Sequence, residues 1–160
     1  MKRASMVFCA VTLLLFLIGV SFAEGTVIPA AADSRTETQQ KEGQPQMKMK
    51  INETLVEVAW ENNESVEALK ELATQGLAIR MSMYGGFEQV GPIGRSLPRS
   101  DRQTVTDSGD IVLYSGDQIV VFYGSNSWAY TRLGKIMDKT AEEMRELLSH
   151  GDVTITIFIE

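Results

Sequence analysis

The sequence predicts a mainly β domain in which about eight strands close into a barrel, with two α-helices outside it or over its ends. Segments of alternating apolar and polar residues recur between residues 47 and 160, and such alternation is typical of half-buried strands. Only two segments have the apolar spacing of an amphipathic helix, which is too few to cover both faces of an open sheet. Closing the sheet into a barrel also removes exposed strand edges.

The N-terminal region predicts export of the protein. Lys2 and Arg3 precede an apolar run over residues 6–20, and small residues follow its end, as in a secretory signal peptide. The run is shorter than the roughly 20 apolar residues that a membrane-spanning helix needs. We therefore expect a signal peptide over residues 1–23, cleavage after Ala23 and no stable membrane span after processing.

The next segment, residues 24–46, is predicted to be a flexible linker. It is rich in Ala, Thr, Gln, Glu and Gly and contains no aromatic residue. Such a segment cannot bury enough apolar area to offset the entropy of an ordered chain. The folded domain is therefore expected to extend over residues 47–160.

The domain is predicted to begin with a hairpin and a helix. Residues 47–51 alternate apolar residues with lysines, and a strand over residues 55–60 follows a short turn. Asn62 or Asn63 can cap the helix, and Gly76 supplies the left-handed residue that ends it. The apolar stripe of the helix consists of Val66, Leu69, Leu72 and Ala73.

A long strand over residues 77–84 is predicted to follow this helix. Residues 85–110 are rich in Gly, Pro, Ser and Asp and are expected to be mostly loop, with extended pieces at residues 87–90 and 104–106. Alternation assigns one face of the long strand to the core. This core face consists of Leu77, Ile79, Met81 and Met83.

The C-terminal part is predicted to contain a hairpin, a helix and a final strand. Residues 111–114 and 118–123 are apolar and are joined by a turn. The second helix begins at Thr140, because Glu143 stands at the capping-box position. Residues 153–159 alternate again and should pair in the sheet.

The composition excludes most catalytic chemistries. The chain has 160 residues, with 15 Lys plus Arg, 21 Asp plus Glu, one His and one Cys. We therefore predict no metal, no cofactor and no catalytic residue, since there is no cysteine pair, cysteine cluster or multi-histidine centre. The formal net charge of -6 argues against nucleic acid as a partner, because such binding needs clustered basic residues. The function classes that the composition leaves open are a binding module and an enzyme that needs no titrating nucleophile.

Two further signals have structural interpretations. Asp107 and Asp110 resemble an acidic metal loop, but Gly and Asp before a strand more often form a turn. His150 falls in the last turn of the second helix, where the helix dipole favours a cation. We therefore interpret His150 as a cap and not a catalyst.

The extended segment over residues 128–136 carries the candidate binding surface. Alternation places Trp128, Tyr130 and Arg132 on one face, and Asn126 lies in the loop before them. A Trp and a Tyr beside an Arg can hold a flat or extended ligand by stacking and cation–π attraction, worth about 0.5 to 2 kcal/mol per contact. The alternative is that both aromatic side chains cover the barrel wall and the Arg caps this packing.

Several sequence runs carry a resemblance to a known family. They are Met83-Tyr84-Gly85-Gly86-Phe87-Glu88, Gly91-Pro92, Arg95-Ser96-Leu97-Pro98, Gly109-Asp110-Ile111, Tyr123-Gly124-Ser125-Asn126-Ser127-Trp128 and Tyr130-Thr131-Arg132-Leu133-Gly134-Lys135-Ile136. Over essentially all of residues 47–160 the chain resembles the bacterial cyclophilin-like domain family. The resemblance implies a cyclophilin-type eight-stranded barrel capped by two helices in a bacterial protein. Together with the predicted signal peptide, it leads us to expect a periplasmic or secreted protein. It implies no established reaction.

Cyclophilins themselves are peptidyl-prolyl isomerases, in which an Arg hydrogen-bonds the prolyl nitrogen and weakens amide resonance. Arg80, ahead of Tyr84 and Phe87, is similar to a cyclophilin segment in which an Arg precedes Gln-Gly-Gly-Asp-Phe, although Tyr84 stands in place of the Gln. Arg95, in the Gly-Pro loop, can either reach a groove or pair with Glu88.

The function predicted from the sequence is a noncatalytic module that binds a peptide or small-molecule ligand in a surface groove. The alternative is a peptidyl-prolyl cis-trans isomerase that acts on periplasmic proteins. The candidate ligand-binding residues are Arg80, Tyr84, Phe87, Arg95, Asn126, Trp128, Tyr130 and Arg132.

Overall fold

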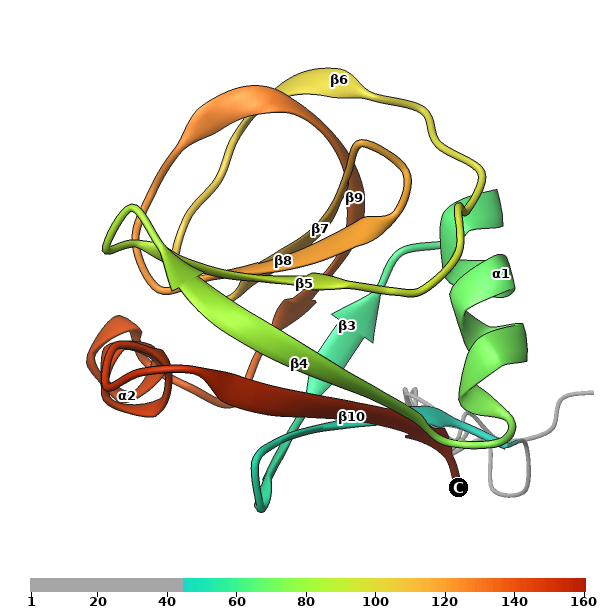
Figure 1. The fold of residues 1–160 in the computed structure, drawn as a ribbon, viewed down its shortest axis with the longest axis horizontal. Helices are drawn as coiled ribbons and strands as arrows, with labels where there is room; N and C mark the ends of the chain where they lie inside the picture. Colours follow the sequence, from blue (N-terminus) through green and yellow to red (C-terminus); the bar gives the residue numbers. More distant parts are fainter. Residues whose placement is uncertain (1–44) are drawn as a thin grey trace, which may run out of the picture. The chain divides into compact units, whose positions relative to one another are not determined.

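Strands dominate the structure, a computed structural model that describes residues 45–160 (Figure 1). The predicted signal peptide and all of the predicted linker before residue 45 lie outside the described residues. The described part contains no helix long and apolar enough to cross a membrane. The elements are β1 (Met47–Ile51), β2 (Thr54–Val56), β3 (Val58–Trp60), α1 (Glu64–Ala73), β4 (Leu77–Tyr84), β5 (Glu88–Pro92), β6 (Arg102–Val105), β7 (Asp110–Tyr114), β8 (Gln118–Phe122), β9 (Ser127–Ile136), α2 (Ala141–Leu148) and β10 (Val153–Ile159).

The strands form a nearly closed antiparallel barrel. Nine of them follow the order β2-β1-β10-β4-β5-β8-β7-β9-β3, and β6 pairs with β9 alone. The two ends of this path, β2 and β3, are consecutive in the chain and are separated only by Glu57. Glu57 is held at this position by Asp138, whose Oδ1 accepts a hydrogen bond from Glu57 N at 2.9 Å. The predicted fold class, a mainly β barrel with two helices, is confirmed.

The strand count differs from the predicted value of about eight for two local reasons. The segment predicted as one strand over residues 55–60 is divided by Glu57 into β2 and β3. In addition, β6 lies outside the main path of the sheet. If β2 and β3 are counted as one bent strand, the nine strands of the path reduce to eight around the barrel wall.

The first and last strands of the domain are neighbours in the sheet. β1 pairs with β10 along its whole length, from Met47 opposite Ile159 to Ile51 opposite Ile155. Gln46 extends this ladder, since its backbone N and O both form hydrogen bonds with Glu160. Regular pairing therefore begins one residue before the predicted start of the domain.

The barrel interior is filled by residues that alternate along the strands, as the sequence predicts for most positions. Ile79 of β4 lies opposite Ile155 of β10, and both are buried. Met83 was predicted to be a core residue, and this is wrong, because 46% of its surface is exposed. β10 pairs with β4 only as far as Met81, so Met83 has no β10 neighbour to pack against.

Both helices begin at caps that the sequence predicts. The Asn63 side chain accepts a hydrogen bond from the backbone of the first turn at 3.0 Å, so Asn63 and not Asn62 caps α1. Thr140 and Glu143 form the complete capping box of α2. Figure 1 shows the two helices at opposite ends of β4 and β10, and their apolar residues join the barrel core.

A second apolar cluster lies on the outer face of the barrel. The C-terminal half of β9 pairs with β7, whereas residues 127–130 pair with β6. A register shift between Ile111 and Val112 accompanies this change of partner, as expected for a bulge that bends the sheet. The resulting two-stranded unit, β6 with residues 127–130, is called the β6–β9 ribbon and arches over β7 and β8 (Figure 1). The cluster consists of Val112, Val120, Phe122 and Tyr130, with Phe87 and Val90 packed against it.

Candidate ligand-binding site

A cavity of about 360 Å³ opens between the β6–β9 ribbon and the outer face of β5, β7 and β8. Cavities of this size hold small organic ligands. We call it the aromatic cavity, because four of its side chains are aromatic. It is lined by Tyr84, Glu88, Val90, Tyr114, Gln118, Val120, Asn126, Trp128 and Tyr130.

Tyr130 forms the rigid inner wall of the aromatic cavity. Its ring makes edge-to-face contacts with Phe122, at a centroid distance of 5.7 Å, and with Tyr114, at 6.1 Å. This arrangement is the favourable one for aromatic pairs. Asn126 Nδ2 donates a hydrogen bond to the Tyr130 hydroxyl oxygen at 3.0 Å. The hydroxyl hydrogen of Tyr130 is therefore free to be donated to another acceptor.

The rim of the aromatic cavity exposes large aromatic side chains to solvent. Tyr84 is 67% exposed and Trp128 is 57% exposed. They come from β4 and from the β6–β9 ribbon, so they approach the opening from different elements. Exposed aromatic surface gathered at the mouth of a cavity is typical of a binding site.

Among the described residues 45–160, Glu88 is the only charged one that lines the aromatic cavity. It is 6% exposed, and its Oε2 is buried without a hydrogen-bond partner. Burial raises the pKa of the Glu88 carboxyl from 4.5 to about 7, because removal from water disfavours the charged form. Burial and the nearby Glu88 charge also raise the pKa of Tyr130, which keeps its hydroxyl protonated. The cavity thus contains an acid whose hydrogen-bonding capacity is not satisfied by the protein.

The structure brings together four of the predicted site residues and separates the other four. Tyr84, Asn126, Trp128 and Tyr130 line the aromatic cavity. Phe87 lies beneath it, packed against the outer apolar cluster. The remaining three residues are arginines that do not line this cavity.

Arg132 is directed to a buried carboxylate and not to the aromatic cavity. Its Nη1 lies 3.3 Å from Asp110 Oδ1 and its Nη2 lies 3.4 Å from Asp110 Oδ2. Asp110 is nearly fully buried and also pairs with Lys135 at 3.2 Å. The predicted common face of Trp128, Tyr130 and Arg132 is therefore only partly formed. Tyr130 and Arg132 line one neighbouring hollow, whereas Trp128 lines the aromatic cavity with Tyr130 and without Arg132.

The other two arginines lie away from the site. Arg80 is exposed on β4, and Arg95 is exposed in the loop after β5. The ion pair between Arg95 and Glu88 that the sequence allowed is not formed, since the Glu88 Oε2 has no partner. Arg80, Tyr84 and Phe87, the residues of the isomerase alternative, do not share one cavity.

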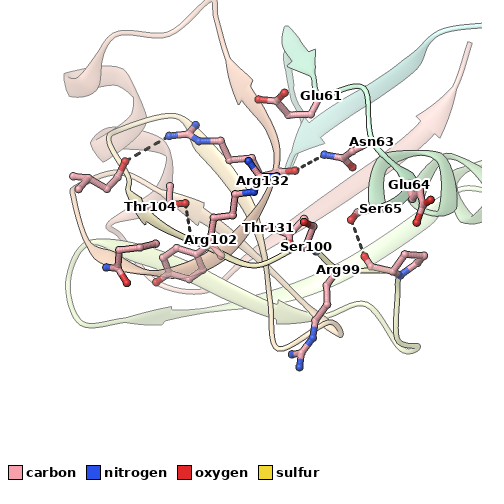
Figure 2. Close-up of a pocket in the computed structure, with 14 residues that line it drawn as sticks. Glu61, Asn63, Glu64, Ser65, Arg99, Ser100, Arg102, Thr104, Thr131 and Arg132 are labelled. Atoms are coloured by element: carbon pink, nitrogen blue, oxygen red, sulfur yellow. Dashed lines mark hydrogen bonds between the residues drawn. The ribbon is translucent and has the colours of Figure 1, made fainter. Parts of the chain in front are cut away.

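A larger hollow of about 820 Å³ lies between the N-terminus of α1 and the strands β6 and β9 (Figure 2). We call it the polar groove. Many of its polar groups already form hydrogen bonds within the protein. Asn63 Nδ2 donates to Arg132 O at 2.9 Å, Ser65 Oγ donates to Pro98 O at 2.7 Å, and Thr131 Oγ1 accepts from Ser100 N at 2.8 Å (Figure 2). The contacts of Pro98 and Ser100 hold the loop before β6 against the rest of the domain. The polar side chains of the groove therefore stabilise the fold, despite the size of the groove.

Other chemical signals in the sequence have structural roles. Asp110 Oδ2 accepts a hydrogen bond from Asp107 N at 2.9 Å, and the segment forms the expected turn. His150 Nδ1 lies 3.0 Å from Glu146 O at the end of α2, as expected for a helix cap. Within residues 45–160, no group of three or more His, Cys, Asp or Glu side chains is placed to hold a metal ion.

Glu88 is a candidate site residue that the sequence alone did not indicate as part of the binding surface. It was considered only as a partner of Arg95. One signal was available: Glu88 shares a strand face with Val90, opposite Phe122 and Val120 of β8. An acidic residue on such an apolar face is unusual and indicates either an ion pair or a site.

Comparison with known proteins gives the same architecture. The sequence profile described as "Cyclophilin-like family" matches residues 49–158. The solution structure of a hypothetical protein from Archaeoglobus fulgidus is similar to this chain with a TM-score of 0.54 and 14% sequence identity, covering 70% of this chain and 92% of that one. At this identity the likeness concerns the fold alone. No curated protein matches the chain.

Proposed function

Because this chain belongs to the cyclophilin-like family, we propose that it is an exported, noncatalytic binding module that holds a peptide or small ligand in the aromatic cavity. The observation that carries the proposal is that Glu88, an acid whose Oε2 is buried without a hydrogen-bond partner, lines a cavity with an aromatic rim. A buried polar group without a partner destabilises the free protein. A ligand that supplies the missing hydrogen bond removes this penalty.

The comparison between the two hollows supports the choice of site. The polar groove is larger, but hydrogen bonds within the protein already occupy many of its side chains. The aromatic cavity keeps an unpaired acid, a free Tyr130 hydroxyl hydrogen and exposed rings. Affinity depends on the groups that a ligand can still satisfy and not on volume alone.

Replacing Trp128 by alanine is expected to weaken the binding of a neutral aromatic probe, 2-phenylethanol, by about fivefold, because one stacking contact is worth about 1 kcal/mol. The stability of the protein should change by less than about 1 kcal/mol, since the Trp128 side chain is more than half exposed. Changes in backbone amide NMR shifts around the aromatic cavity, followed during titration, provide the measurement.

The matched control for this experiment is Val105→Ala. Val105 is also exposed on the β6–β9 ribbon but lines the polar groove, so its loss should leave the affinity unchanged. If Trp128→Ala and Val105→Ala change the affinity for 2-phenylethanol equally, the aromatic cavity is not the binding site. Turnover of a prolyl bond in an NMR exchange assay, lost in Arg80→Ala and retained in Trp128→Ala, would instead favour the isomerase alternative.

The export part of the proposal is supported by the charged start, the short apolar run and the small residues before Ala23. Expression of the full chain in a bacterium should therefore yield a protein that begins at Glu24. Intact-mass spectrometry measures this directly. Recovery of a membrane-bound chain that still begins at Met1 would contradict the proposal.

A further inference from the structure

We infer that the ligand of the aromatic cavity carries a protonated amine, whose N–H groups are held by the Glu88 carboxylate and whose charge lies against the aromatic rings. This inference rests on the proposed function, since it assigns the ligand class for the same cavity. It starts from Glu88, which is buried, faces the cavity and has an unpartnered Oε2.

The first argument is the missing counter-charge. A buried carboxylate is usually paired with a cation or fully hydrogen-bonded, because an isolated buried charge is costly. In the part of the chain that the structure describes, none of the other residues that line the cavity carries a charge. The cation that would pair with Glu88 is therefore absent from the cavity wall, and a cationic ligand would supply it.

The second argument is the character of the walls. Tyr84, Tyr114, Trp128 and Tyr130 surround the opening and the interior. The faces of aromatic rings carry partial negative charge and attract ammonium groups, most strongly in a desolvated site. The net charge of -6 for the whole chain also favours the approach of cations and disfavours that of anions.

The third argument concerns the alternatives. A carboxylate ligand would place a like charge beside Glu88. A divalent metal ion needs several oxygen ligands, and the described residues contain no group of three acidic, His or Cys side chains that could hold one. A neutral aromatic molecule can fill the cavity but leaves Glu88 without a partner of opposite charge.

The inferred site has a defined pH dependence. The titratable groups that lie close enough to Glu88 to be affected by its charge are Tyr123 and Tyr130, and burial together with Glu88 raises the pKa of both phenols, so both stay uncharged at neutral pH. With a pKa of about 7, Glu88 is ionised to about 3% at pH 5.5 and about 90% at pH 8. An aliphatic amine stays protonated over this range. Its affinity should therefore rise about 30-fold between these two values.

The test uses three probes of similar size: phenethylamine, the neutral 2-phenylethanol and the anionic 3-phenylpropanoate. At pH 8, phenethylamine should bind the wild-type protein at least about tenfold more tightly than 2-phenylethanol, and 3-phenylpropanoate should bind most weakly. Glu88→Gln should abolish the preference for the amine and its pH dependence while keeping the affinity for 2-phenylethanol. Glu61→Gln, which removes a charge from the polar groove, should keep both.

The outcomes separate the inference from the proposed function. If no probe shifts the amides around the aromatic cavity, the proposed binding function is wrong. If 2-phenylethanol binds there as tightly as phenethylamine, the proposed function stands and the amine assignment is wrong. An amine preference that survives in Glu88→Gln would also overturn the assignment, because the charge would then be recognised elsewhere.

Discussion

Replacing Glu88 by glutamine is expected to raise the free energy of unfolding at pH 8 by about 3 kcal/mol. The pKa of the carboxyl is raised by burial from 4.5 to about 7, and each unit corresponds to about 1.4 kcal/mol. The folded state therefore binds the proton more tightly than the unfolded state. The free energy of unfolding therefore falls as the pH rises from about 4.5 to about 7. Above about pH 7, Glu88 is ionised in both states and lowers the free energy of unfolding no further. Glutamine is neutral throughout and avoids the loss.

Urea unfolding of the wild type and of Glu88→Gln at pH 4 and pH 8 measures this effect. At pH 4 the carboxyl is mostly protonated in both states, so the titration of Glu88 contributes little to the difference between the two proteins. Glu61→Gln is the control, because Glu61 is exposed. A difference between wild type and Glu88→Gln that is the same at both pH values would show that Glu88 is not held in a desolvated environment.

If Glu88→Gln stabilises the protein and also abolishes the binding of amines, the acid is kept at the expense of stability. Such a trade-off is typical of functional sites, where a group is placed for a ligand and not for the fold. The same pair of measurements therefore distinguishes a binding residue from a residue that merely supports the barrel.

Replacing Gly91 by alanine is expected to lower the free energy of unfolding by about 3 kcal/mol or more. A Cβ atom at this position in β5 would lie 2.5 Å from Met81 Sδ, 2.6 Å from Arg80 O and 2.8 Å from Ile79 Cγ2. The sulfur could move, but the carbonyl oxygen belongs to the backbone of β4, the neighbouring strand of the sheet. Relief of the contact would require β4 and β5 to separate, and dense packing resists this.

The control for this prediction is Gly76→Ala. Gly76 has a left-handed backbone conformation, with φ of 76°, but no atom would lie within 4 Å of an added Cβ. Replacing Gly76 by alanine should lower the free energy of unfolding by only about 1 to 2 kcal/mol, which is the cost of a left-handed backbone conformation for a residue with a Cβ atom. Thermal unfolding of the two variants compares the effects. A melting temperature of Gly91→Ala equal to or above that of Gly76→Ala would contradict the prediction, because the clash between β5 and β4 would then cost no more than the backbone strain at Gly76.

The parts of the fold that the sequence predicts best are those fixed by local contacts. The cap of α1 at Asn63 and the capping box of α2 depend on residues within one helical turn, so their spacing in the sequence is sufficient evidence. The hairpin of β7 and β8 is equally local. Met83 shows the limit, because its exposure depends on where the distant β10 begins.

The candidate site was predicted only in part, for the same physical reason. Trp128 and Tyr130 could be placed together from strand alternation. The separation of Arg132 from Trp128 accompanies the change of partner along β9. The burial of Glu88 depends on the β6–β9 ribbon, which comes from residues well beyond it in the sequence. The change of partner along β9 has no signature in the neighbouring residues, whereas the acidic residue on the strand face of Val90 is the one local sign of the Glu88 site.

The pairing of β1 with β10 has a consequence for the order of events during folding. The first strand of the domain can pair locally with β2, but its other edge stays unpaired until the last strand, β10, has been synthesised, and bringing such distant segments together is entropically costly. Local pairs such as β7 with β8 can form earlier. Until β10 arrives, β1 and β4 both keep open hydrogen-bonding edges, which are prone to pair with other chains. The nascent domain is therefore most vulnerable to aggregation just before its final residues emerge.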